Sequence, residues 1–116
     1  MPEKQMPIAE FVTNGVKKYQ DLLPGVGKTY EAMTSEVYKS GALDAKTKRL
    51  MAISIALTHG CRGCILFQTE QSLKLGASVE EIIEACSVAV AVGGTMAGGE
   101  TSRVIQFLTE LGKIES

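Results

Sequence analysis

The chain has 116 residues, of which 45% are apolar, and a formal net charge of −1. This length suffices for one domain with one core, and the apolar fraction excludes a disordered protein. A net charge this close to zero gives no electrostatic reason to expect a nucleic-acid partner or binding to an anionic membrane surface.

The N-terminal third of the chain predicts two helices. Apolar residues recur at helical spacing between positions 8 and 19, and the pair Pro24–Gly25 follows this pattern as a stop signal. The stripe of the first helix consists of Ile8, Phe11, Val12, Val16 and Tyr19. The stripe of the second consists of Tyr30, Met33 and Val37, and its pattern ends near Gly41.

The middle of the chain predicts a third and a fourth helix. Asp44 is suited to cap the third helix at its N-terminus, and Gly60 is suited to end it. The fourth helix is expected from about Cys61 to Leu75, with Gly76 just after its end. The expected buried face of the third helix consists of Leu50, Ile53 and Leu57, widened by Met51 and Ile55.

The C-terminal part predicts two more helices. Ser78-Val79-Glu80-Glu81 is a capping-box sequence at the start of a helix, in which Cys86 lies within an apolar run and is assigned to the core. A glycine-rich joint, GGTMAGG, precedes the last helix, which Gly112 ends. No segment shows the strict alternation of a half-buried strand. The fold class is therefore all-α, with about six helices in a single domain over residues 1–116.

The longest nearly uncharged stretch, Ile82 to Gly99, predicts an interface rather than a membrane span. It carries Glu84 and several glycines, which favours a buried or interface helix. A helix this apolar is hard to cover within a chain of this length. We therefore expect a homo-oligomer. The first residues, MPEKQMPIAEF, lack the apolar region of a signal peptide. We therefore expect a soluble, cytoplasmic protein.

The stretch HGCRGCILFQTEQ carries a cysteine pair with the geometry of a redox couple. Cys61 follows Gly60 and is expected in the first turn of a helix, where free backbone N–H groups and the helix dipole favour a thiolate. Arg62 adds a neighbouring cation, and these effects lower a thiol pKa. Cys64 lies one turn further on, so the two Cα atoms are expected roughly 5–6 Å apart, within disulfide range.

Two other interpretations of the pair have less support. A structural zinc site needs four ligands, and the chain offers only three cysteines and one histidine without a second close pair. We therefore expect no metal and no other cofactor. A purely structural role of both cysteines in the core is opposed by Arg62 and Gly63 between them, which argue against full burial.

A longer segment around the pair resembles a known family. KTKRLMAISIALTHGCRGCILFQTEQSLKLGASVEEIIEACSVAVAVGG, residues 46–94, is similar to the carboxymuconolactone decarboxylase and alkylhydroperoxidase D-like family, in its Cys-x-x-Cys branch. The family-like core is placed at about residues 46–111. This resemblance implies the alkylhydroperoxidase D-like helical fold and a symmetric homo-oligomer, a trimer or a hexamer.

The resemblance also implies an antioxidant chemistry. A peroxide, or a disulfide, would be the substrate. A peroxide would convert Cys64 to a sulfenic acid, with which Cys61 would condense to a disulfide. A dithiol donor, either a lipoyl group or a thioredoxin-like protein, would then restore both thiols.

The chain departs from the peroxidase branch at its proton relay. That branch carries a Glu twelve residues before the first cysteine and a His four after the second, where this chain has Arg49 and Gln68. Neither is a base at neutral pH. Gln68 shares a helix face with Cys64 and can hydrogen-bond a sulfur or a bound oxygen. Arg49 either turns inward, where its charge would stabilise a thiolate, or turns outward into solvent.

Other side chains are candidate replacements for the relay. His59, the only histidine, is either a substitute base or a partner of the terminal carbonyls of its own helix. Glu70, Glu84 and Glu100 are further candidate proton acceptors, of which the last two lie in apolar or small-residue surroundings.

Three functions remain open from the sequence. The leading one is a thiol-dependent oxidoreductase, either a peroxidase or a disulfide reductase. The second is a cofactor-free decarboxylase of a carboxylated lactone, for which Arg49 and His59 would supply the cation and the proton donor. The third is a non-enzymatic oligomeric helical module with a degenerate site.

Overall fold

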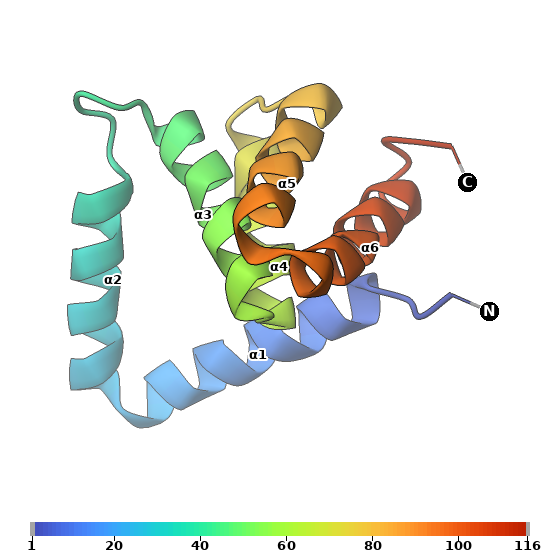
Figure 1. Ribbon diagram of the computed structural model, residues 1–116. Coiled ribbons are helices and arrows are strands. Elements are labelled where there is room, and N and C mark those ends of the chain that lie inside the picture. Colours follow the sequence, from blue (N-terminus) through green and yellow to red (C-terminus); the bar gives the residue numbers. More distant parts are fainter. Residues whose placement is uncertain (1, 116) are drawn as a thin grey trace.

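The computed structural model describes residues 2–115, which form six α-helices and no strand (Figure 1). The predicted all-α fold is thus confirmed. The helices are α1 (Met6–Leu22), α2 (Pro24–Tyr38), α3 (Ala45–His59), α4 (Arg62–Lys74), α5 (Val79–Gly93) and α6 (Thr95–Glu110).

The predicted capping residues lie at the ends of α3 and at the start of α5. The Asp44 carboxylate accepts the backbone N–H of Thr47 at 2.7 Å at the start of α3. Gly60 ends α3 with a φ of 69°, in the left-handed region that favours glycine. At the start of α5, Ser78 and Glu81 exchange both bonds of a capping box, at 2.9 and 3.1 Å. Helices α3 and α5 therefore begin where the chain offers their free backbone N–H groups a local partner.

Helices α3 to α6 form a bundle with α3 packed against α4, α5 and α6 (Figure 1). Apolar faces of these four helices meet in one core, and Cys86 lies in it, as predicted, with 2% of its surface exposed. The larger members of the core are Ile53, Leu57, Ile65, Ile82, Val104 and Leu108.

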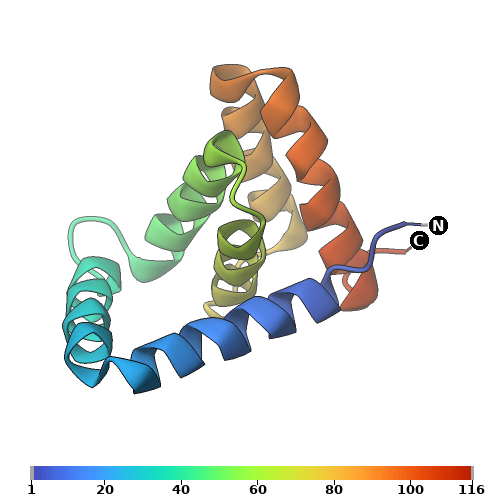
Figure 2. The same cartoon turned by 90° about the horizontal axis from the view of Figure 1, so that it is seen from below.

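Helices α1 and α2 form an arm outside this bundle, in which α1 runs beneath α4 and α2 stands off to one side (Figures 1 and 2). No residue of α1 is buried, and Gly27 is the one buried residue of α2. The predicted stripes therefore form helices, but most of their side chains are not covered within this chain: Phe11 is 79% exposed and Met33 is 56% exposed. Periodicity predicts an apolar face and not what covers it.

The same limit applies to part of α3. Ile53 and Leu57 are buried as predicted, whereas Met51 and Ile55, which were expected to widen the buried face, are 47% and 56% exposed. The buried stripe of α3 is therefore narrower than the sequence indicates.

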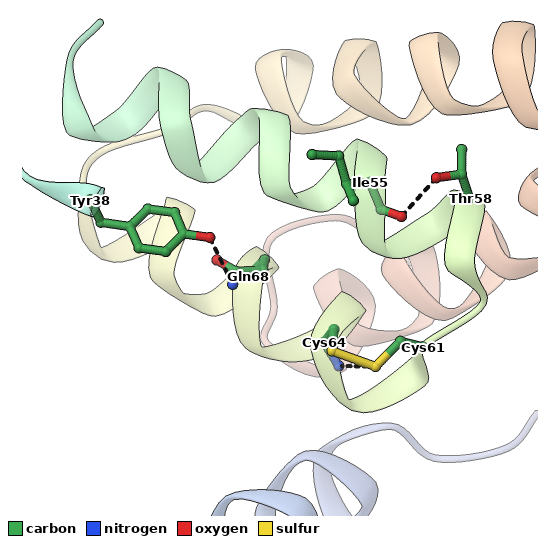
Figure 3. Close-up of a disulfide and its surroundings, with 6 residues drawn as sticks. All are labelled: Tyr38, Ile55, Thr58, Cys61, Cys64 and Gln68. Carbon is green, nitrogen blue, oxygen red and sulfur yellow. Dashed lines mark hydrogen bonds between the residues drawn. A yellow bond between two sulfur atoms is a disulfide. The ribbon is translucent and has the colours of Figure 1, made fainter. Parts of the chain in front are cut away.

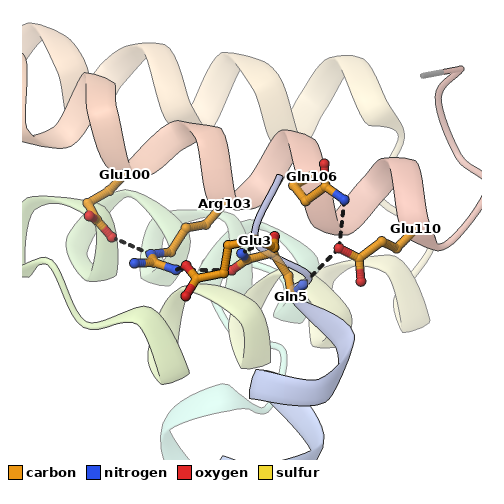
Figure 4. Close-up of polar contacts among 6 residues, drawn as sticks. All are labelled: Glu3, Gln5, Glu100, Arg103, Gln106 and Glu110. Atoms are coloured by element: carbon orange, nitrogen blue, oxygen red, sulfur yellow. Dashed lines mark hydrogen bonds and ion pairs between the residues drawn. The ribbon is translucent and has the colours of Figure 1, made fainter. Parts of the chain in front are cut away.

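Polar contacts attach the beginning of the arm to α6 (Figure 4). The two carboxylate oxygens of Glu110 accept the backbone N–H groups of Gln5 and Met6 at 2.7 and 2.8 Å. Arg103 pairs with Glu3 at 2.8 Å. Glu110 thus supplies the N-terminal cap that α1 lacks in its own sequence.

The joint between α5 and α6 is shorter than predicted. Gly94 alone connects the two helices, and Thr95 to Gly99, expected as part of the joint, already belong to α6. Gly94 has φ 73° and ψ −152°, a backbone region that is nearly exclusive to glycine. One residue in this conformation reverses the chain and brings α6 back against α5. Within residues 2–115, no helix has the length and apolar character needed to span a bilayer.

Candidate functional site

The cysteine pair lies at the turn between α3 and α4 (Figure 3). The chain reverses at Gly60, so that Cys61 directly precedes α4 and Cys64 lies in its first turn. Their Cα atoms are 5.3 Å apart and their sulfurs are joined as a disulfide. The expected distance range is therefore met without any change in the backbone.

Cys61 lies one position earlier than predicted. It is the N-cap of α4 and not a residue of its first turn, and its Sγ accepts the backbone N–H of Cys64 at 3.3 Å. The difference arises because the sharp turn at Gly60 leaves Cys61 with an extended backbone, φ −87° and ψ 95°. The free N–H of Cys64 at the start of α4 thus faces the sulfur of Cys61, which favours negative charge on that atom.

A cleft of about 420 Å³ adjoins the two sulfurs. Cys64 is exposed and Cys61 is half-buried, so the pair is reachable from solvent. The cleft has an apolar wall contributed by α3 and polar groups around it. Its lining consists of Tyr38, Ala52, Ile55, Ala56, His59, Cys61, Cys64 and Gln68. A small molecule in this cleft would contact the sulfurs, and both polar and apolar neighbours.

Gln68 and Arg49, the residues at the relay positions, bond to each other. Arg49 Nη1 donates to Gln68 Oε1 at 2.9 Å, and Gln68 Nε2 donates to the Tyr38 hydroxyl at 3.5 Å (Figure 3 shows the second bond). The guanidinium carbon of Arg49 lies 3.6 Å from the ring centroid of Tyr38, a cation–π distance. Of the two orientations considered for Arg49, the structure thus has the inward one.

Arg49 nevertheless does not line the cleft, because Gln68 does. Burial lowers the pKa of the Arg49 guanidinium from its ordinary value, and the hydroxyls of Tyr38 and Tyr30 act in the opposite direction. A guanidinium stays protonated at neutral pH, so Arg49 offers charge and donors but no base.

The other candidate bases are distributed over the molecule. His59 is the last residue of α3 and lines the cleft. Glu70 pairs with Lys74 at 3.7 Å on the surface, and Glu100 pairs with Arg103 at 2.9 Å. Glu84 is exposed. None of the three glutamates lines the cleft. They are therefore not placed to accept a proton from a molecule bound there.

The third cysteine is separate from the site. Burial raises the pKa of the Cys86 thiol to about 11. A thiol with so high a pKa carries almost no thiolate at neutral pH, so Cys86 is unsuited to be a nucleophile. Within the part of the chain that the structure describes, no three His, Cys, Asp or Glu side chains lie close enough to hold a metal ion.

A second hollow, of about 510 Å³, lies between the middle of α6 and the segment that precedes α1. Its cation, Arg103, is already paired with Glu3 and Glu100 (Figure 4). It contains neither sulfur of the pair, so the cleft at Cys64 remains the better candidate for chemistry.

Tyr38 and the apolar wall of the cleft are not predictable from the sequence. Tyr38 is the last residue of α2, and the loop before α3 brings it to the cleft. No motif marks a tyrosine at this place, and the family-like segment was placed from position 46 onward. Ala52, Ile55 and Ala56 were part of a predicted helix, but periodicity does not reveal a cavity.

Comparison with known proteins extends the resemblance toward the N-terminus. The carboxymuconolactone decarboxylase family profile matches residues 24–104, which include α2 and the whole of the cleft. Two curated relatives are uncharacterised proteins. One, from Cupriavidus necator, is 26% identical over 76% of this chain and 78% of its own length. The other, protein 4 of the cox locus in Paracoccus denitrificans, is 29% identical over 74% of this chain and 78% of its own length.

Solved structures show the same fold. A carboxymuconolactone decarboxylase family protein from Legionella pneumophila has a TM-score of 0.87 and 29% identity, over 94% of this chain and 97% of that one. A protein from Thermotoga maritima has a TM-score of 0.78 and 33% identity, over 91% of this chain and 96% of that one. A second structure of the Thermotoga protein, for which a part in an antioxidative response has been suggested, has a TM-score of 0.72 and 34% identity, over 86% and 91% of the two chains.

Proposed function

Because the chain belongs to the carboxymuconolactone decarboxylase family, we propose that it is a thiol-dependent oxidoreductase of the alkylhydroperoxidase type, in which Cys61 and Cys64 cycle between dithiol and disulfide. The observation that carries the proposal is the disulfide-bonded pair at the start of α4, with Cys64 exposed beside a cleft. A pair one turn apart on a helix opens and closes without unfolding the bundle.

In the oxidative half-reaction, the Cys64 thiolate attacks a peroxide. A sulfur–oxygen bond forms, the oxygen–oxygen bond breaks, and an alcohol leaves after taking up a proton, so that Cys64 becomes a sulfenic acid. The Cys61 thiolate then attacks the Cys64 sulfur. A disulfide forms and the hydroxyl leaves as water with a second proton. Exposure of Cys64 in the cleft supports its role as the attacking sulfur.

In the reductive half-reaction, an external dithiol opens the disulfide. One donor thiolate attacks the Cys64 sulfur, and Cys61 leaves as a thiolate. The second donor thiol then releases the donor as its own disulfide, leaving both protein thiols reduced. The backbone N–H of Cys64, which faces Cys61 Sγ at 3.3 Å, favours Cys61 as the leaving group. A lipoyl group or a thioredoxin-like protein fits the role of donor.

The decarboxylase alternative has less support from the geometry. It needs a free cation to bind a substrate carboxylate, and Arg49 already bonds to Gln68 and stacks on Tyr38 outside the cleft lining. A dithiol reaction needs no such cation.

A homo-oligomer in the cytoplasm is part of the same proposal. Support comes from the large apolar side chains that α5 exposes, among them Val88 at 58% and Val92 at 81%. Light scattering coupled to size-exclusion chromatography would measure the number of chains. A purely monomeric protein over the micromolar range would contradict the homo-oligomer.

The test of the function is peroxide consumption by the reduced protein with dihydrolipoamide as the donor. We expect turnover that Cys64→Ser abolishes. Cys61→Ser should stop at a sulfenic acid that dimedone traps, and mass spectrometry should find the 61–64 disulfide in the wild type and in neither of these two variants. Cys86→Ala, at the buried cysteine, is the matched control and should keep turnover. Equal turnover by the Cys61→Ser/Cys64→Ser double variant would contradict the function.

A further inference from the structure

Tyr38 is held in place from three directions at the edge of the cleft. Lys48 Nζ donates to the backbone oxygens of Val37 and Lys39, at 2.8 and 2.7 Å, and so fixes the backbone on both sides of Tyr38. The Arg49 guanidinium stacks on its ring at 3.6 Å, and the Gln68 amide contacts its hydroxyl at 3.5 Å. Tyr38 is thus tightly positioned, although it ends a helix of which only Gly27 is buried.

The direction of these hydrogen bonds leaves the Tyr38 proton free. A guanidinium has donors and no acceptor, so the oxygen of the Gln68 amide must face Arg49. The amide nitrogen therefore faces Tyr38 and donates to its oxygen. A phenol that accepts in this way still has its own O–H to donate. Arg49 and Gln68 together orient Tyr38 as a donor.

The Tyr38 hydroxyl and the Cys64 sulfur belong to the same cleft. Tyr38, Gln68 and Cys64 line the same cavity, and Cys64 and Gln68 lie one turn apart on one face of α4 (Figure 3). A molecule whose one oxygen contacts Cys64 Sγ therefore extends along the face that leads to Tyr38. No carboxylic acid lines this cleft. His59 also lines it, but within residues 2–115 no hydrogen bond orients its ring toward the sulfurs, whereas three side chains hold Tyr38.

The peroxide reaction requires a donor at this place. When sulfur displaces an alkoxide from a peroxide, negative charge builds up on the leaving oxygen, and a hydrogen bond directed at that oxygen speeds the step. We propose that the Tyr38 hydroxyl is a catalytic hydrogen-bond donor to the leaving oxygen when Cys64 attacks a peroxide, which presupposes the proposed peroxidase function. The leaving alkoxide takes the Tyr38 proton and departs as an alcohol. The tyrosinate regains a proton from solvent, which had received one when the Cys64 thiol ionised.

Tyr38→Phe isolates the hydroxyl, because the ring that Arg49 contacts is retained. In a stopped-flow measurement of the reduced protein with tert-butyl hydroperoxide, we expect the second-order rate constant to fall about ten- to a hundredfold. Reduction of the 61–64 disulfide by dithiothreitol releases no oxygen and should stay within about twofold of the wild type. Tyr19→Phe, at an exposed tyrosine of α1, is the matched control and should react as the wild type does.

The leaving group separates a catalytic from a structural role. With peracetic acid the leaving group is acetate, a weak base that needs little help from a proton donor. We expect Tyr38→Phe to react with peracetic acid within about threefold of the wild-type rate, while the loss with tert-butyl hydroperoxide persists. An equal loss with both oxidants, or slowed reduction by dithiothreitol, would show that Tyr38 only shapes the site and would overturn the proposal.

The two levels of the proposal fail in different ways. A wild-type rate for Tyr38→Phe with tert-butyl hydroperoxide overturns the role of Tyr38 and leaves the peroxidase function standing. A wild-type protein that reacts with neither oxidant overturns the function, and the role of Tyr38 with it.

Discussion

The α3–α6 bundle and the α1–α2 arm are built on different principles. Every helix of the bundle buries at least three side chains, whereas α1 buries none and α2 buries only Gly27. The bundle is held by apolar burial and the arm by a few directed contacts. Yet the arm supplies Tyr38, which lines the cleft beside the two sulfurs. The bundle thus supplies both the core and most of the cleft lining, and the arm, which buries little, adds Tyr38 to it.

The largest expected difference concerns two phenylalanines. Phe107 in α6 is 1% exposed and Phe11 in α1 is 79% exposed. Phe107→Ala should lower the free energy of unfolding by about 3–5 kcal/mol, because it leaves a cavity in the core. Phe11→Ala should change it by less than about 0.5 kcal/mol. Urea denaturation of both variants measures the difference. Equal losses would mean that a second chain covers the arm, and the contrast between the two regions would disappear.

A smaller effect is expected where the arm touches the cysteine turn. A Cβ at Gly63 would lie 2.9 Å from Val12 Cγ1, which is closer than such atoms normally approach. Gly63→Ala should therefore cost about 1 kcal/mol, since crowding outweighs the better helix propensity of alanine. Combined with Val12→Ala, which opens the space, the same change should become neutral or stabilising. A double-mutant cycle that finds no coupling would show that α1 does not bear on this turn.

The smallest expected effect concerns the attachment of α1 to Glu110. Glu110→Ala removes the acceptor of two backbone N–H groups, so α1 should open more easily by about 1 kcal/mol. Hydrogen exchange should speed up at the amides of α1 and stay unchanged in α3. Glu36→Gln, which removes an exposed ion pair with Lys39, is the control and should have no measurable effect. Faster exchange throughout the bundle would contradict the separation of the two regions.

The same contact predicts a dependence on pH. Burial raises the pKa of Glu110, but the N–H groups of Gln5 and Met6 outweigh it, so the pKa lies below the ordinary value of 4.5. A carboxyl with a depressed folded-state pKa contributes stability that is complete above its unfolded pKa and is lost as the pH falls through the folded value. Protection of α1 should therefore decrease below about pH 4.5 in the wild type, and this decrease should be weaker in Glu110→Ala.

Local signals predicted the bundle well. Asp44, Gly60 and the Ser78–Glu81 box act within four residues of their own position, so the sequence alone is enough to place them. The reach of Cys61 to Cys64 likewise follows from helix geometry. The sequence was less informative on the arm, because an apolar stripe does not say whether its own chain covers it.

The site was predictable only where one helix carries it. Cys64 and Gln68 share a face of α4, and sequence spacing alone places them together. Tyr38 reaches the cleft through the packing of α2 beside α3, to which no local motif points. The orientation of Arg49 stayed open for the same reason, since it depends on Tyr38 and Gln68 from two other helices.

The hydrogen bond from the Cys64 N–H to Cys61 Sγ makes that amide a spectroscopic reporter of the redox state of the cysteine pair. Opening the disulfide changes the partner of that one N–H while the buried core remains in place. A nitrogen-15 correlation spectrum should therefore show the Cys64 cross-peak moving with the redox state, with far smaller shifts at core amides such as Leu57. The reduction potential of the pair could then be measured by titration with both cysteines chemically unmodified, without a dye or a coupled enzyme.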